Sequence, residues 1–315
     1  MDRDSRIFVA GHRGLVGSAL VRSLTAQGYH NQVCRTRADL DLRHGGAVRA
    51  FFQEERPEYV FLAAARVGGI LANATHPVEF LLENLEVQNS VIRAAHESGV
   101  KKLLFLGSSC IYPRMAPQPI KEEYLLSGPL EPTNDAYAVA KIAGIKLCHA
   151  YHAEYGAHFL SVMPTNLYGP DDNFDLQSSH VLPALLRKFH TSRETGAPEV
   201  TVWGTGAVRR EFLHVDDMAD ACVYLMRTYD SPEIVNIGTG EDVTIRELAE
   251  IIRGIVGYRG RLAFDTSKPD GPPRRLLDVS RLHGLGWRHR IGLEEGIARV
   301  YCQVDKAGWV AAPGG

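Results

Sequence analysis

The stretch Arg6-Ile-Phe-Val-Ala-Gly-His-Arg-Gly-Leu-Val-Gly17 determines the architecture at the start of this 315-residue chain. Its first five residues predict a short buried strand, three glycines follow in the spacing Gly-x-x-Gly-x-x-Gly, and residues 18–26 predict a helix. Such a turn lets the backbone approach a pyrophosphate, whose charge the helix N-terminus then stabilises. The spacing departs from Gly-x-Gly-x-x-Gly, and either pattern alone also fits an ordinary strand-to-helix turn.

Strand and helix patterns alternate after this turn. Strand-like runs occur at residues 32–35, 59–63, 102–107 and 158–163, with helical patterns at 78–98 and 136–155. The alternation predicts an α/β fold with a Rossmann-type doubly wound parallel sheet. After Pro164 we expect short strands and loops, with strands at 199–203, 211–214, 234–237 and 261–264. We therefore expect a nucleotide-binding domain over residues 1–165, to which segments near 205–237 return. A smaller C-terminal α/β substrate lobe mainly over 166–315 would follow, with 311–315 frayed.

Composition and charge argue against several classes of protein. Thirty-five basic and 37 acidic residues give a net charge of −2, which does not favour binding to nucleic acid or a membrane surface. The chain has no N-terminal apolar segment and no uninterrupted apolar stretch long enough to span a membrane, so we expect a cytoplasmic protein with a small-molecule partner. Its five cysteines form no Cys-x-x-Cys pair, which argues against a disulfide framework or a metal site.

Three side chains predict a proton-transfer site. Tyr137 and Lys141 are four residues apart and would share one helix face. Ser108 follows the strand-like run 102–107, at the sheet edge where open α/β sheets bind ligands. The ammonium would lower the pKa of the phenol from about 10 toward neutrality and bind a cofactor ribose, while Ser108 would hold a substrate carbonyl oxygen. Alternatively, the tyrosine packs and the lysine extends along an amphipathic helix.

Arginines at the end of the second strand predict the cofactor. An NAD enzyme places a carboxylate there for the ribose 2′-hydroxyl, whereas guanidinium groups accommodate a 2′-phosphate. This chain has Arg35 and Arg37 there, with Arg13 in the glycine turn, and the arrangement favours NADPH. Asp39 and Asp41 would cap the next helix or meet the adenine, and the alternative for Arg37 is a solvated surface charge.

Several long motifs carry a resemblance to a known family. They are Gly11-His-Arg-Gly-Leu-Val-Gly17, Ala63-Ala-Ala-Arg-Val-Gly-Gly-Ile70, Leu106-Gly-Ser-Ser-Cys-Ile-Tyr-Pro113, Leu130-Glu-Pro-Thr-Asn-Asp-Ala-Tyr-Ala-Val-Ala-Lys141, Met163-Pro-Thr-Asn-Leu-Tyr-Gly-Pro170, Arg210-Glu-Phe-Leu-His-Val-Asp-Asp-Met218 and Lys268-Pro-Asp-Gly271. With these motifs the chain resembles the extended short-chain dehydrogenase/reductase superfamily and, within it, the GDP-L-fucose synthase family. The resemblance implies NADPH-dependent conversion of GDP-4-keto-6-deoxy-D-mannose to GDP-L-fucose. It also implies a homodimer, with helices near 78–98 and 136–155 packed across a two-fold axis, although apolar residues such as Phe80 and Val91 could equally face the sheet.

The same resemblance assigns residues to the reaction. Epimerisation at C3 and C5 proceeds through enolates, with Cys110 as base and His180 as acid, and reduction at C4 follows. The implied catalytic residues are Ser108, Cys110, Tyr137, Lys141 and His180. The implied cofactor-binding residues are Gly11, His12, Arg13, Gly14, Leu15, Val16, Gly17, Arg37, Asp39, Leu40, Asp41, Leu106, Gly107, Ser108, Lys141, Pro164, Thr165, Asn166, Leu167 and His180. Cys110 could instead be a small buried hydrophobe, and His180 merely the start of a helix.

Four further residues are implied to bind the GDP-sugar. Arg210 and Lys188 would meet the diphosphate, Trp203 would offer an aromatic surface to the nucleotide, and Asp270 would accept hydrogen bonds from hydroxyls. Trp203 could instead fill a core, and Arg210 could form a surface ion pair with Glu211 or Asp216.

Two other functions stay open at this point. A nucleotide-sugar 4-epimerase would return the hydride to the same carbon and consume no NADPH. A non-catalytic dinucleotide-sensing scaffold would have no need for Ser108, Tyr137 and Lys141 together.

Overall fold

The fold was obtained as a computed structural model that describes residues 1–176, 178–268 and 270–307; the predicted frayed end at 311–315 lies outside them. Its central sheet has six strands in the order β10-β5-β4-β3-β1-β2, and every pair is parallel. The strands are β1 (Ile7–Ala10), β2 (Gln32–Val33), β3 (Tyr59–Leu62), β4 (Lys102–Leu106), β5 (Phe159–Pro164) and β10 (Val235–Ile237). The predicted Rossmann-type parallel sheet is confirmed.

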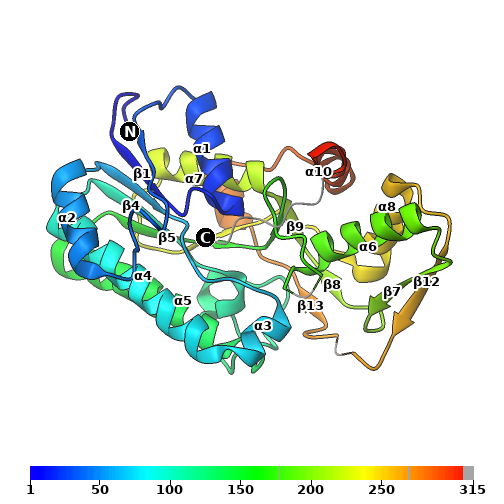
Figure 1. Cartoon of the computed structure of the whole chain (residues 1–315). Coiled ribbons are helices and arrows are strands. Elements are labelled where there is room, and N and C mark those ends of the chain that lie inside the picture. The colour runs from blue at the N-terminus through cyan, green and yellow to red at the C-terminus, as the bar shows by residue number, and fades with distance from the viewer. Residues whose placement is uncertain (177, 269, 308–315) are drawn as a thin grey trace.

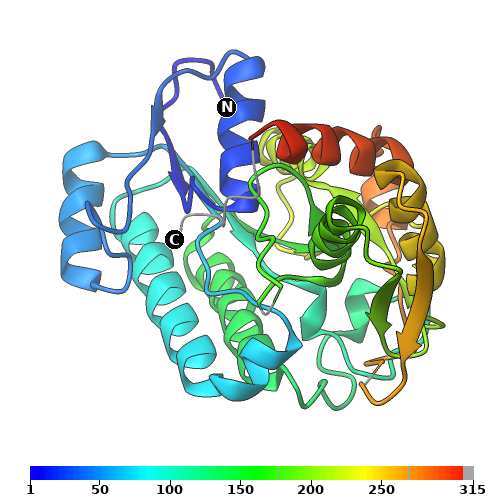
Figure 2. The same ribbon diagram turned by 45° about the vertical axis from the view of Figure 1, so that its right-hand side comes forward.

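Helices cover both faces of this sheet, which explains why β4 and β5 consist entirely of buried residues. Helices α2 (Gly45–Glu55), α4 (Pro77–Glu97) and α5 (Asp135–Tyr155) pack on one face through a core that includes Phe52, Ile92 and Ile145. Helices α1 (Leu15–Ala26) and α7 (Val215–Thr228) pack on the other through Leu20 and Met218 (Figure 1). In Figure 2, α4 and α5 lie side by side along one flank of the molecule.

A smaller lobe has its own apolar core. Helices α6 (Val181–Thr195), α8 (Ile245–Val256) and α10 (Leu293–Ala307) pack with the parallel pair β7 (Glu199–Trp203) and β12 (Arg261–Asp265). Short strands join this lobe to the central sheet: β6 (Asn166–Tyr168) pairs with β9 (Phe212–His214), and β8 (Arg209–Arg210) lies between β11 (Val243–Thr244) and β13 (Arg274–Arg275). The remaining elements are α3 (Ile70–Thr75), α9 (Ser280–Gly284) and two 3-10 turns, η1 (Ser109–Ile111) and η2 (Glu122–Tyr124).

The short strands and loops expected after Pro164 leave out the helices of the α/β lobe, because α6, α7, α8 and α10 all lie there. Helix α8 was predictable from its apolar pattern. Its buried residues recur at helical spacing: Ile245, Leu248, Ala249, Ile252 and Val256. Its start is also marked, since Thr244 and Glu247 form a reciprocal capping box. The strand expected at 234–237 exists, and β10 joins the central sheet beside β5.

All five cysteines are free thiols. Within the part of the chain that the structure describes, no helix combines the length and apolarity needed to cross a membrane.

Candidate active site

The glycine turn between β1 and α1 forms a tight backbone cradle. Gly11 has φ of 84°, and a Cβ at Gly17 would lie 2.0 Å from the Gly11 carbonyl oxygen, so both positions require glycine. Helix α1 begins at Leu15, earlier than predicted, and its first turn contains no acidic residue. His12 adds a buried Nδ1 with no hydrogen-bond partner among the described residues. A positive helix end, free of carboxylates and approachable by another backbone, fits a pyrophosphate.

Arg35 has a carboxylate partner of its own at the end of β2. Its guanidinium forms an ion pair with Glu55 and lies 5.6 Å from the Phe51 ring centroid. Arg37 is exposed, and its guanidinium forms ion pairs with Asp41 at 3.9 Å and with Glu83 at 4.0 Å. Its position after β2 keeps it a candidate for the 2′-phosphate.

Asp39 and Asp41 do not cap helix α2 with their side chains, which corrects one of the two expectations for them. Asp39 accepts hydrogen bonds from the Thr36 amide and hydroxyl at 3.1 and 2.6 Å, and these bonds lower its pKa. Asp41 binds the Arg43 guanidinium, with a shortest distance of 2.6 Å, and this bond holds its pKa well below the usual range. Both carboxylates shape the loop after β2, and Leu40 between them is buried in the core.

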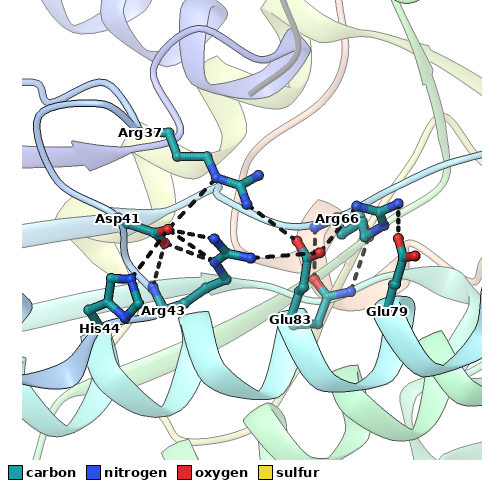
Figure 3. A network of polar contacts seen from close by, with 8 residues as sticks. Arg37, Asp41, Arg43, His44, Arg66, Glu79 and Glu83 are labelled. Carbon is teal, nitrogen blue, oxygen red and sulfur yellow. Dashed lines mark hydrogen bonds and ion pairs between the residues drawn. The ribbon is translucent and has the colours of Figure 1, made fainter.

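The loop after β2 belongs to a network of paired charges on α4 (Figure 3). Glu83 lies 3.8 Å from Arg43 and 3.2 Å from Arg66, and Arg66 also pairs with Glu79. Asn84 fixes the Arg66 backbone in both directions, since it accepts from the amide at 3.0 Å and donates to the carbonyl at 3.1 Å. Every arginine drawn in Figure 3 therefore has at least one carboxylate partner.

Lys141 is buried at the carboxyl end of β4, and Tyr137 is half-buried beside it. The Lys141 side chain is 3% exposed, donates to the Leu106 carbonyl at 2.8 Å and lies 5.9 Å from the Tyr137 ring centroid. Burial lowers the pKa of Lys141 to about 7. Burial also raises the pKa of Tyr137 well above its usual value, as does the nearby Cys110, while a hydrogen bond with Ser108 opposes the rise.

The predicted lowering of the Tyr137 pKa is therefore wrong for the chain by itself. A half-neutral lysine that points at a carbonyl provides little positive potential, and the loss of hydration outweighs it. The phenol is held in its protonated form, which suits a proton donor better than a base.

Ser108 and Cys110 lie on one sharp turn that opens the 3-10 turn η1. The Cys110 amide donates to the Ser108 hydroxyl oxygen at 3.2 Å, which fixes the two side chains relative to each other. The Asn134 amide donates to the Cys110 sulfur at 3.3 Å. Cys110 is partly accessible and takes part in polar contacts, so it is not a buried hydrophobe.

His180 precedes helix α6 as its N-cap residue, but its side chain caps no amide. The imidazole is accessible to solvent, yet surrounding protein atoms restrict its hydration and lower its pKa. Among the described residues, no hydrogen bond or ion pair joins it to Cys110 or Tyr137. The side chain is thus free to meet a ligand, and the structure does not fix its partner.

Trp203 does not fill a core, because it is 54% exposed at the end of β7. Lys188 and Lys268 place their ammonium groups 5.3 and 5.6 Å from its ring centroid. Lys188 also donates to the Thr201 carbonyl at 3.2 Å, and its partial burial lowers its pKa. An accessible indole flanked by cations suits a base and an attached phosphate.

Arg210 does not form the expected alternative ion pair with Glu211 or Asp216. Its guanidinium donates to the carbonyls of Arg209 at 2.8 Å and Asp270 at 3.3 Å. Burial and the neighbouring Arg275 lower the pKa of Arg210 to about 10. The Asp270 carboxylate is occupied by the Thr205 amide and hydroxyl, at 2.8 and 2.9 Å.

The segment Pro164–Leu167 leaves β5 toward the smaller lobe. Thr165 and Asn166 donate to the Glu211 carbonyl at 3.3 and 2.8 Å. The buried Glu211 carboxylate in turn accepts from the amides of Thr239, Gly240 and Leu277, at 2.6, 2.8 and 2.9 Å. Glu211 thereby ties the strand that carries Arg210 to the end of the central sheet.

Comparison with known proteins agrees with this geometry. A sequence profile of the NAD dependent epimerase/dehydratase family matches residues 7–238. The chain belongs to this family. It is 58% identical over 300 residues to GDP-L-fucose synthase 1 of Arabidopsis thaliana, covering 95% of this chain and 93% of that protein. It is 56% identical over 305 residues to GDP-L-fucose synthase of Escherichia coli, covering 94% of this chain and 95% of the relative.

A solved structure extends the match to three dimensions. The crystal structure of a GDP-L-fucose synthetase from Naegleria fowleri bound to NADP superimposes with a TM-score of 0.92 at 31% identity. The alignment covers 99% of this chain and 96% of that one. The glycine cradle of this family member, with the exposed Arg37 after β2, fits the same cofactor.

Three residues of this epimerase/dehydratase family member escaped sequence reasoning: Asn134 at the Cys110 sulfur, Glu211 at the lobe junction and Arg275 at the Ser109 carbonyl. Asn134 lies inside a motif quoted above, three residues before Tyr137, so its position was a usable signal. Arg275 had no such signal, because its contact spans 166 residues of sequence.

Proposed function

We propose that this chain converts GDP-4-keto-6-deoxy-D-mannose to GDP-L-fucose, with NADPH as the reductant. The observation that carries the proposal is the turn that places Ser108 and Cys110 together beside Tyr137 and Lys141. Reduction alone needs Ser108, Tyr137 and Lys141, whereas a thiol in the same pocket also gives access to the carbons next to the ketone. The high identity to named GDP-L-fucose synthases over nearly the full length supports the same activity.

In the epimerisation, the ketone at C4 acidifies the protons on both C3 and C5. The Cys110 thiolate removes one of these protons, and the negative charge of the resulting enolate collects on the C4 oxygen. The Ser108 hydroxyl and the Tyr137 phenol hydrogen-bond that oxygen, and stabilisation of such a developing charge accounts for several kcal/mol of catalysis. Protonated His180 returns a proton to the opposite face of the ring. Cys110 and His180 then exchange protons with water before the second inversion.

In the reduction, Tyr137 donates its phenolic proton to the C4 oxygen as the alcohol forms. The raised pKa of Tyr137 keeps this proton in place until that step. Lys141, with a pKa lowered to about 7, can pass a replacement proton to the tyrosinate. The glycine cradle at residues 11–17, Arg37 and residues 164–167 would hold NADPH, and the bound cofactor would supply the hydride for C4.

Substrate recognition is assigned to the smaller lobe. Arg210 and Lys188 would bind the diphosphate, and neither has a carboxylate within ion-pair distance in the described ranges. Trp203 would stack on the guanine, and Asp270 would orient hydroxyl groups from the Thr205 turn. The boundary near residue 165 would then separate cofactor binding from substrate binding, with α7 and β10 belonging to the first part.

Assembly and compartment are part of the same proposal. Val78 and Leu82 on α4 and Val139 on α5 are 72%, 51% and 47% exposed, while Phe80 is buried beside the Tyr137 ring and Val91 lies in the core that packs on the sheet. These exposed apolar residues on adjacent helices support a homodimer packed through α4 and α5. Five free thiols support the reducing cytoplasm as its compartment.

The decisive experiment uses the substrate and NADPH in deuterated water. Wild-type enzyme should oxidise NADPH and place deuterium at C3 and C5 of GDP-L-fucose. Cys110→Ser should suppress incorporation by about 10²- to 10⁴-fold, because it removes the base, and it should still bind NADPH. Cys302→Ser, at an exposed thiol outside the pocket, is the matched control and should be unaffected. Undiminished deuterium incorporation in Cys110→Ser would reject the assignment, and turnover without net NADPH oxidation would favour a 4-epimerase.

A further inference from the structure

Strands β8 and β13 place four arginines on two faces of one parallel pair. Arg274 is opposite Arg209, and Arg275 is opposite Arg210. Arg209 and Arg274 both bind the carboxylate of Asp242. Because side chains alternate along a strand, Arg210 and Arg275 point to the other face, toward the active-site pocket.

Arg275 is a buried cation without an anionic partner. Its side chain is 8% exposed, and its Nη1 donates to the Ser109 carbonyl oxygen at 2.7 Å. No carboxylate lies within 4.0 Å of its guanidinium in the ranges that the structure describes. Burial of an unpaired guanidinium is unfavourable, and one hydrogen bond to a carbonyl does not offset the lost hydration of the charge. A purely structural contact to Ser109 could be made by a neutral donor at much lower cost.

The Ser109 carbonyl belongs to the peptide that connects Ser109 to Cys110. The amide of that same peptide donates to the Ser108 hydroxyl oxygen at 3.2 Å. A positive charge on the carbonyl polarises the peptide and strengthens its N–H as a donor. Since the Ser108 oxygen accepts this bond, its own hydrogen is left for the phenol or for a substrate ketone, and the polarisation makes that hydrogen a better donor.

We infer that Arg275 is a positioning residue that acts through the Ser109–Cys110 peptide, fixing Cys110 and strengthening Ser108 as a hydrogen-bond donor to the substrate ketone. This role rests on the proposed function and deepens it. It also connects the lobes, because Arg275 comes from the substrate-binding lobe and Ser109 from the end of β4. The two guanidinium groups then have different tasks: Arg210 faces the substrate, and Arg275 faces the turn that carries the reacting side chains.

The test compares Arg275→Met, Arg275→Gln and Arg275→Lys with the matched control Arg274→Met. Arg275→Met should lower kcat about 10- to 100-fold, less than loss of a direct oxyanion donor, with KM and NADPH affinity changed less than about threefold. Arg275→Lys keeps the charge and a donor and should recover most of the activity. Arg275→Gln, which keeps only the donor, should fall between them, and Arg274→Met should stay within about twofold of wild type.

Three results would overturn the inference: an unchanged kcat in Arg275→Met, a raised KM with unchanged kcat, or an Arg275→Lys variant no better than the Met variant. Thermal unfolding shows whether each variant folds, and if Arg275→Met does not, the Lys and Gln variants carry the same comparison.

A substrate-independent measurement separates this inference from the proposed function. Alkylation by iodoacetamide, followed on the Cys110 peptide by mass spectrometry, should slow about 3- to 10-fold in Arg275→Met, because the peptide that carries Cys110 loses the contact that fixes it. Alkylation of the exposed Cys302 should not change. Slowed alkylation together with a wild type that does not turn over the GDP-sugar would reject the proposed function alone, whereas an unchanged Cys110 rate would reject the role of Arg275.

Discussion

Two groups of cations in this molecule differ in how their charge is balanced. The arginines beside α4 lie near the surface, and each has a carboxylate partner (Figure 3). Lys141 lies at the carboxyl end of β4, Arg210 and Arg275 lie at the junction of the lobes, and the hydrogen bonds of all three go to carbonyl oxygens. Paired charges near water contribute little to stability and keep ordinary protonation, whereas buried unpaired charges are costly. The comparison teaches that the cations whose burial lowers stability are the ones able to bind an anion or transfer a proton.

Lys141 provides the largest expected effect. Lys141→Met should lower the rate of ketone reduction by about 10²- to 10⁴-fold, because the proton relay to Tyr137 is lost. The folded-state pKa of Lys141 is lowered to about 7, below its ordinary value of 10.5, so between these values the unfolded chain binds the extra proton. The stability of the wild-type protein should therefore rise with pH between about 7 and 10 and should be lowest, for this group, below pH 7.

Urea unfolding at pH 7 and pH 9 checks whether the free energy of unfolding rises with pH. At pH 7 the ligand-free Met variant should be more stable than wild type by up to a few kcal/mol, with a flatter pH dependence. Lys146→Met, an exposed lysine on the same helix, should match wild type. Parallel pH profiles for wild type and Lys141→Met would contradict the contrast between the two groups of cations.

Arg210 provides an intermediate effect. Arg210→Met should raise the Kd for GDP and the KM for the GDP-sugar about 10- to 100-fold, since hydrogen bonds to charged groups contribute about 1.5–3 kcal/mol each. NADPH affinity should not change. Arg209→Met removes an arginine from the same strand whose partner is Asp242, and it should have a much smaller effect on GDP binding. Equal losses in the two variants would show that position on the strand, rather than the missing carboxylate partner, decides the effect.

Arg37 provides the smallest expected effect, and it tests the group of cations that have carboxylate partners. Arg37 is exposed after β2 and forms ion pairs with Asp41 at 3.9 Å and Glu83 at 4.0 Å, so its guanidinium can reach a 2′-phosphate bound at the surface. Arg37→Ala should weaken NADPH binding about 5- to 10-fold without affecting NADH, and it should change the free energy of unfolding by less than about 1 kcal/mol. Arg43→Ala, which loses a 2.6 Å pair with Asp41, is the control. Fluorescence titration of each variant with NADPH and with NADH measures the two affinities. An equal loss of NADPH affinity in Arg37→Ala and Arg43→Ala would assign the effect to the charge network as a whole.

Much of the fold was predictable because it depends on local patterns. The apolar runs of β3 and β4 and the long helices α4 and α5 lie within a few residues of their predicted positions. The helices of the smaller lobe were missed, although α8 has both a buried stripe and a capping box. Trp203 and Arg210 do not take the structural alternatives of a core position and a surface ion pair, because β12 and β13, distant in sequence, supply their neighbouring strands.

The sequence by itself determined the glycine cradle, the parallel sheet and the identity of the side chains at its carboxyl edge, because each depends on residue type at short spacing. Only the tertiary structure decided the protonation of Tyr137 and Lys141, the partners of Arg35 and the contact between Arg275 and Ser109. Desolvation and charge pairing depend on atoms that distant segments bring together, and no short stretch of sequence contains that information.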